Sequence, residues 1–231
     1  MFRFKQFALS DSRCGMKIGT DGLLLGAWAG NGKDFKSICD IGAGCGIVGL
    51  MLAQRFAHAR VTFVENNPSA ALDLADNIAA SPWSDRCATV IDDFATVSLP
   101  AVDMIVSNPP FFLTGELSPV AERAAARHGE SLSPLTLINY SRDALDPSGV
   151  LAMIVPAEQY DSIVEHAAFA GLNISRLCYV VTAPGKEPKR MLIELTPAQV
   201  VCRREQLTIR DTSGRFTEQY CALTRDFHLN M

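Results

Sequence analysis

The chain has 231 residues, of which 48% are hydrophobic and 20% are charged, and its formal net charge is −4. This length suits one α/β domain with a sizeable core, and the composition excludes a disordered chain or a coiled coil. The longest apolar stretch, Leu23 to Ala29, is shorter than the ~20 residues of a membrane helix, and the first residues alternate polar and aromatic side chains, unlike a signal peptide. We therefore expect a cytoplasmic protein that does not enter a membrane.

The seven cysteines form no Cys-x-x-Cys pair and no Cys/His cluster with the spacing of metal ligands. Their odd number also argues against a disulfide framework. We expect reduced thiols, no metal site and, by default, a monomer.

From residue 37 onward, short β-rich runs alternate with helical stretches, which is typical of βαβ units on a parallel sheet. The expected strands are 37–41, 61–65, 89–91 and 102–106, and the expected helices are 47–56 and 69–79. A break follows from 108 to 133, and Ser133 and Pro134 are then expected as the N-cap and first residue of a helix.

A strand at 149–155 and a helix at 159–170 complete the alternating pattern. The apolar runs 177–181 and 191–195 follow with no helix between them, which indicates an antiparallel hairpin at one sheet edge. We predict a doubly wound, mostly parallel seven-stranded sheet with one reversed strand near the edge. The expected single domain consists of a flanking segment (1–36), a core (37–200) and a C-terminal extension (201–231).

A glycine-rich turn, Asp40-Ile41-Gly42-Ala43-Gly44-Cys45-Gly46, ends the first core strand and opens a helix. Glycines at such a turn let the backbone approach a ligand closely. The spacing is Gly-x-Gly-x-Gly and not the Gly-x-Gly-x-x-Gly of dinucleotide sites, so a nicotinamide cofactor is disfavoured. Asp40 would repel a pyrophosphate but would accept a hydrogen bond from an amino-acid ammonium.

Two further strand ends carry acids. Glu65 closes the second strand, where a carboxylate can accept both hydroxyls of a ribose. Asp92-Asp93-Phe94 closes the third, where an acid beside an aromatic ring suits an adenine amine, and we favour Asp93 for that contact. Together with Asp40, Gly42 and Gly44, these acids indicate S-adenosylmethionine as the cofactor.

The fourth strand runs into Asn108-Pro109-Pro110-Phe111. The two prolines fix φ and donate no N–H, so this stiff loop presents unpaired carbonyls. The Asn108 side-chain oxygen and the Pro109 carbonyl can accept the two hydrogens of a planar exocyclic amine, which directs its lone pair toward a methyl donor. Phe111 is expected to stack on the flipped base. We predict that this tetrapeptide is catalytic and that Asn108 also borders the cofactor.

These motifs resemble the class I, Rossmann-like methyltransferases of the Asn-Pro-Pro-[Phe/Tyr] type. The likeness is greatest to the bacterial adenine-N6 methyltransferases that modify position 37 of tRNA1(Val), and it extends over nearly the whole chain. Beside the motifs above, it rests on residues 4–7, 14–28, 81–83, 126–127 and 222–227.

The resemblance implies that tRNA is the partner and that further residues belong to the site. Lys17, Gly19, Thr20 and Asp21 would line the cofactor pocket near its methionine end. Residues that would contact the substrate are Phe111, Arg127, His128 and Arg190. The basic residues near the N-terminus and at Lys189-Arg190 favour RNA despite the negative net charge.

Three alternatives stay open at this point. A guanine-N2 methyltransferase of ribosomal RNA and a glutamine-N5 methyltransferase of protein would use the same tetrapeptide. A catalytically silent RNA-binding module would not need to keep Asp40, Glu65 and Asn108 together.

Overall fold

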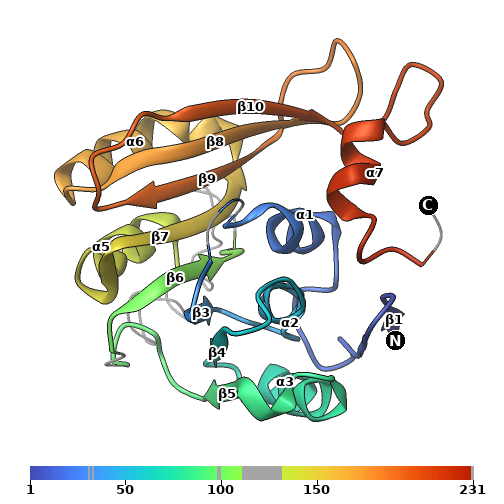
Figure 1. The fold of residues 1–231 in the computed structure, drawn as a ribbon, viewed down its shortest axis with the longest axis vertical. Coiled ribbons are helices and arrows are strands. Elements are labelled where there is room, and N and C mark those ends of the chain that lie inside the picture. The colour runs from blue at the N-terminus through green and yellow to red at the C-terminus, as the bar shows by residue number, and fades with distance from the viewer. Residues whose placement is uncertain (31, 33, 98–99, 111–131, 230–231) are drawn as a thin grey trace, which may run out of the picture.

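An eight-stranded sheet separates two layers of helices (Figure 1). The computed structural model describes residues 1–30, 32, 34–97, 100–110 and 132–229. Within them the strand order is β10-β8-β9-β7-β6-β3-β4-β5, and β9 alone runs against its neighbours. The strands are β3 (Ser37–Ile41), β4 (Arg60–Val64), β5 (Cys87–Val90), β6 (Val102–Ser107), β7 (Leu145–Pro156), β8 (Asn173–Val181), β9 (Arg190–Thr196) and β10 (Arg203–Thr208). The predicted doubly wound sheet with one reversed strand is confirmed.

The eighth strand corrects the prediction of seven strands. β10 lies in the segment 201–231, which the sequence analysis placed outside the core, and it pairs in parallel with β8. Its position was missed because Arg203 and Arg204 are exposed and the strand lacks the apolar alternation of a half-buried one, as is common at a sheet edge. The β8–β9 hairpin is antiparallel as predicted, but β10 pairs with β8 beside it, so β10 and not the hairpin is the edge strand.

The helices cover the two faces of the sheet as separate layers (Figure 1). Each layer packs its apolar side chains into its own buried cluster on the sheet, as a doubly wound fold requires. One face carries α1 (Thr20–Trp28), α2 (Ile47–Arg55), α3 (Pro68–Ala80) and α7 (Glu218–Thr224), and the other carries α5 (Pro134–Ala144) and α6 (Tyr160–Phe169). A two-stranded sheet of β1 (Phe2–Arg3) and β2 (Ala8–Leu9) precedes them. No helix among the described residues is long and apolar enough to cross a membrane.

The start of α5 confirms the predicted N-cap. The Ser133 side chain accepts a hydrogen bond from the Thr136 N–H at 3.2 Å, Thr136 Oγ1 accepts one from the Ser133 N–H at 2.9 Å, and Pro134 is the first helical residue. This reciprocal capping satisfies two N–H groups that a helix leaves unpaired.

Buried polar side chains of α3 fasten the N-terminal segment beside the glycine-rich turn. The Asn77 amide donates to the carbonyls of Ser10 at 2.8 Å and Cys45 at 2.9 Å, and Asp73 accepts from the Arg13 N–H at 2.6 Å. Asp73 and Asn77 lie one helical turn apart, on one face of α3. The segment that leads into α1 is therefore held next to the turn after β3.

The C-terminal end of α1 is fixed by charged side chains. The Arg55 guanidinium donates to the carbonyls of Gly26 at 2.9 Å and Ala29 at 2.6 Å, groups that a helix end leaves without backbone partners. Glu194 accepts from the Gly30 N–H at 2.7 Å. These contacts set the position of α1 on the sheet.

Candidate functional site

A cavity of about 310 Å³ lies at the carboxyl ends of β3 and β6, where open α/β sheets bind ligands. The N-terminal end of α1 and the turn after β3 form most of its wall. Eight of the residues predicted for the site line it: Lys17, Gly19, Thr20, Asp21, Asp40, Gly42, Gly44 and Asn108. Residues far apart in the chain are thus brought together around one cavity.

The turn after β3 depends on glycine. Gly42, Gly44 and Gly46 have φ values of 69°, 56° and 86°, a backbone conformation that residues with a Cβ rarely adopt. The N–H groups of Gly42 and Ala43 both donate to the Val64 carbonyl, at 2.9 and 3.1 Å. This bonding draws the turn onto the end of β4 and leaves its other side facing the cavity.

Asp40 is an acid buried at the cavity wall. Its side chain accepts a hydrogen bond from the Gly49 N–H at 2.8 Å, and the residue is only 2% exposed. Burial raises the pKa of Asp40 to about 7, the Gly49 bond opposes this rise, and the nearby Glu65 charge adds to it. A cation bound in the cavity would offset the cost of burying this carboxylate.

Glu65 is held under the glycine-rich turn. One carboxylate oxygen accepts from the Gly44 N–H at 2.7 Å and the other from the Asn67 N–H at 2.8 Å. The prediction that Glu65 binds ribose hydroxyls rested on its position at a strand end alone. The structure shows that Glu65 also fixes both the turn and the start of α3. A carboxylate oxygen has two acceptor sites, so these bonds leave Glu65 capacity for hydroxyl groups.

A narrower cavity of about 30 Å³ adjoins the first, since Gly42 lines both. Its other lining residues are Val64, Asn66, Asp92, Phe94 and Leu132. Both acids accept hydrogen bonds in the following turn: Asp92 Oδ1 accepts from the Asp93 N–H at 2.7 Å and from Thr96 Oγ1 at 3.2 Å, and Asp93 accepts from the Ala95 N–H at 3.0 Å. Asp92 is nevertheless the acid that lines this cavity. The geometry therefore favours Asp92, in contrast to the preference for Asp93 from sequence.

Asn108 presents a buried acceptor at the end of β6. β6 is tied to the end of β3 by a 2.7 Å hydrogen bond from Ser107 Oγ to the Ile41 carbonyl. Asn108 follows directly, and its Oδ1 is buried and accepts no hydrogen bond from any residue that the structure describes. A buried acceptor left unpaired costs about 1–3 kcal/mol, so its place in a cavity wall points to a bound donor. Pro109 is buried and Pro110 is half-buried beside it.

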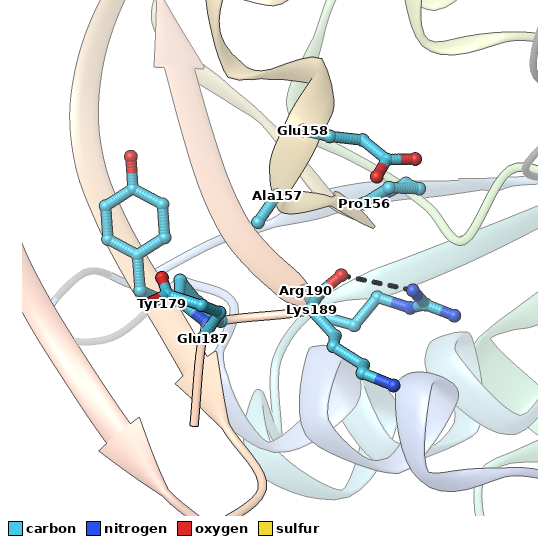
Figure 2. A pocket seen from close by; sticks show the side chains of 8 residues that line it. Pro156, Ala157, Glu158, Tyr179, Glu187, Lys189 and Arg190 are labelled. Carbon is cyan, nitrogen blue, oxygen red and sulfur yellow. Dashed lines mark hydrogen bonds between the residues drawn. The ribbon is translucent and has the colours of Figure 1, made fainter. Parts of the chain in front are cut away.

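Arg190 lies outside the cofactor cavity and beside it. Its Nε donates to Asp21 at 2.9 Å, and its guanidinium also donates to the Lys189 carbonyl at 3.1 Å (Figure 2). Arg190 and Lys189 line a separate open groove of about 730 Å³. Phe111, Arg127 and His128 fall outside the described residues.

Sequence reasoning missed some residues that shape the site. Asn66 lines the narrow cavity, Ile47 and Val48 line the larger one, and Ser107 ties the end of β6 to the end of β3. Each was next to a motif that had been found, but a single Asn, Ser or Val gives no signal without its spatial neighbours. Among the described residues no group of three His, Cys, Asp or Glu side chains is arranged to hold a metal ion.

Comparisons with known proteins agree with this geometry. The methyltransferase small domain family matches residues 12–169. A Tolumonas auensis protein named tRNA1(Val) (adenine(37)-N6)-methyltransferase is 38% identical over 100% of this chain and 97% of its own length. A Porphyromonas gingivalis protein of the same name is 42% identical over 99% and 94%. The structure of a predicted O-methyltransferase from Agrobacterium tumefaciens has a TM-score of 0.64 at 20% identity, over 89% of this chain and 96% of that one, and shares the fold. The chain belongs to the methyltransferase small domain family and, within it, to the tRNA1(Val) (adenine(37)-N6)-methyltransferases.

Proposed function

We propose that this protein transfers a methyl group from S-adenosylmethionine to the N6 amine of an adenosine in tRNA, at position 37 of tRNA1(Val). The observation that supports this most strongly is the buried Oδ1 of Asn108, to which no described residue donates, in the wall of a cavity that Asp40 also lines. The names of full-length relatives at about 40% identity support adenine and tRNA over guanine and protein.

The residues present fit the cofactor. When bound, S-adenosylmethionine supplies an electrophilic methyl group on a sulfonium. Asp40 would hold its ammonium, and Glu65 its ribose hydroxyls. Asp92 would hold the adenine amine beside Phe94. The remaining contacts would come from the cavity wall, at Lys17, Gly19, Thr20, Asp21, Gly42, Gly44 and Asn108.

The catalytic work falls to the loop after β6. The N6 amine is a poor nucleophile because its lone pair is delocalised into the purine ring. Asn108 Oδ1 and the Pro109 carbonyl would each accept one amine hydrogen, which favours a pyramidal nitrogen and offsets its developing positive charge. Phe111 would stack on the extruded base, and Arg127, His128 and Arg190 would contact the RNA.

Incubation with labelled S-adenosylmethionine and separate pools of tRNA, ribosomal RNA and protein tests this function. We expect label in N6-methyladenosine from tRNA. Label in N2-methylguanosine or in N5-methylglutamine would contradict the adenine assignment, and no transfer to any pool would favour a silent binding module.

Replacing Asp92 with alanine should weaken S-adenosylmethionine binding by about 10- to 150-fold, since a hydrogen bond that involves a charged group contributes about 1.5–3 kcal/mol. Asp93→Ala is the matched control, because both carboxylates accept hydrogen bonds in the same turn but only Asp92 lines the cavity. Calorimetric titration of both variants checks this. A larger loss of S-adenosylmethionine affinity in Asp93→Ala than in Asp92→Ala would show that Asp93 makes the adenine contact.

Cofactor affinity should fall as the pH is lowered. Because burial raises the pKa of Asp40 to about 7, acid protonates the carboxylate and removes the charge that attracts an ammonium. The dissociation constant of S-adenosylmethionine should therefore rise about tenfold between pH 8 and pH 6. Asp40→Asn should bind weakly and show no such pH dependence. A wild-type affinity that is constant over this range would show that Asp40 does not meet the ammonium.

A further inference from the structure

An open groove lies beside the cofactor cavity, at the carboxyl end of β7. Its lining residues are Pro156, Ala157, Glu158, Tyr179, Glu187, Pro188, Lys189 and Arg190, and we call it the Tyr179 groove. Pro156 ends β7, the strand that pairs in parallel with β6, and it lies three residues beyond Met153, which is opposite Ser107. At about 3.3 Å per residue, the groove begins about 10 Å beyond the end of β6.

One ion pair links this groove to the cofactor cavity. Arg190 lines the groove, Asp21 lines the cavity, and the Nε of Arg190 lies 2.9 Å from the Asp21 carboxylate. Arg190 is also opposite Pro156 in the β7–β9 ladder, so its backbone is fixed beside the carboxyl end of β7. The groove and Asn108 thus both lie toward the carboxyl ends of the parallel strands.

The lining of the groove suits a nucleotide. Tyr179 stands on one side and Lys189 and Arg190 on the other, with Glu158 and Pro156 nearby (Figure 2). An aromatic face can stack on any base, and the two cations can bind a phosphate. Glu158 and Glu187 add two exposed carboxylates, which would repel a free anion but can accept hydrogen bonds from the amino groups of bases. This mixture favours a whole nucleotide over an isolated phosphate.

The Tyr179 ring has a supported position. It projects from β8, an internal strand, and its centroid lies 6.3 Å from that of Tyr160 at the start of α6. The ring is half-buried, so one part packs on the protein while another faces the groove. A stacking surface that is already ordered loses little conformational entropy when a base binds.

We propose that the Tyr179 groove binds a nucleotide that flanks the target adenosine, with its base on Tyr179 and its phosphate at Lys189 and Arg190. This inference rests on the proposed function, and it identifies a part of the protein that recognises tRNA outside the catalytic pocket.

The test measures KM for an in vitro transcript of tRNA1(Val), together with the dissociation constant of S-adenosylmethionine, for four variants. Tyr179→Ala should raise KM by about 5- to 150-fold, as expected for a lost base stack, whereas Tyr179→Phe should stay near the wild type. Phe169→Ala is the control, because Phe169 is 84% exposed at the end of α6. Lys189→Ala should raise KM and lower the slope of log affinity against log salt by about 1. Cofactor binding should not change in any of them.

A second control separates charge from position. Lys36→Ala removes the same charge from the residue before β3, at the amino ends of the parallel strands and therefore at the opposite end of the sheet from the groove. This variant should leave the salt slope unchanged. If the wild type methylates tRNA and both Tyr179→Ala and Lys189→Ala keep the wild-type KM, the groove does not bind RNA. If Tyr179→Ala has a lower melting temperature than the wild type, the KM of Lys189→Ala decides whether the groove binds RNA, because Lys189 is exposed and its replacement should not affect folding. A wild type that modifies protein instead of tRNA would overturn the proposed function and the inference together.

Discussion

Replacing Asn108 with alanine is expected to lower kcat by about 100- to 1,000-fold, the loss typical of removing one preorganised hydrogen-bonding group from the reacting centre. The affinity for S-adenosylmethionine should change by less than about threefold, because one uncharged contact contributes little to binding. The melting temperature should stay the same or rise, since the variant removes a buried acceptor that no described residue satisfies.

The measurements are single-turnover methylation of tRNA, calorimetric titration of the cofactor and thermal unfolding. Asn139→Ala, an exposed asparagine on α5, is the matched control and should leave all three unchanged. If Asn108→Ala loses cofactor affinity in proportion to kcat and also melts early, then Asn108 supports the loop and does not contact the amine.

The variant Glu194→Ala should lose about 3–5 kcal/mol of unfolding free energy, because it leaves a buried cation without its closest partner. Arg176 lies 3.2 Å from Glu194, and the exposed fractions of the two side chains are 10% and 5%. Glu194 also accepts from the Gly30 N–H at the end of α1. In a chain of this length the loss corresponds to a fall of about 6–20 °C in melting temperature.

Glu205→Ala is the control for this prediction. Glu205 is also an ion-pair partner of Arg176, at 3.4 Å, and it accepts from Trp28 Nε1 at 3.3 Å, but its side chain is 24% exposed, so water can replace it in both contacts. Its removal should cost about 1 kcal/mol or less. Since α1 lines the cofactor cavity with its first residues, Glu194→Ala should also weaken cofactor binding. Equal losses in the two variants would show that burial of the Arg176–Glu194 pair contributes nothing specific.

Features that depend on local chemistry could be predicted from the sequence. The turn at Gly42, Gly44 and Gly46 requires positive φ, which few other residues adopt, so its position and shape follow from the residues themselves. The cap at Ser133 and Pro134 is equally local. The meeting of Asp40 and Asn108 at one cavity could also be expected, because both lie at the carboxyl ends of neighbouring parallel strands.

Features that depend on distant neighbours could not be predicted. The residues that fix α1, Arg55 and Glu194, are 139 positions apart in the sequence and look like ordinary surface charges until packing brings them to one helix end. Tyr179 gave no signal, because a tyrosine in a strand is usually core or surface and only the groove around it suggests stacking. The choice between Asp92 and Asp93 depended on the direction in which one turn leaves β5.

Methylation of adenosine N6 in tRNA by the loop after β6 is tested most directly by nucleoside mass spectrometry of one transcript pair. The tRNA1(Val) transcript with adenosine at position 37 and the same transcript with guanosine there are each incubated with the wild-type protein and S-adenosylmethionine. We predict N6-methyladenosine in the first transcript and no methylated nucleoside in the second. Equal N6-methyladenosine in both transcripts would contradict the position, and N2-methylguanosine in either would contradict the chemistry that Asn108 is proposed to perform.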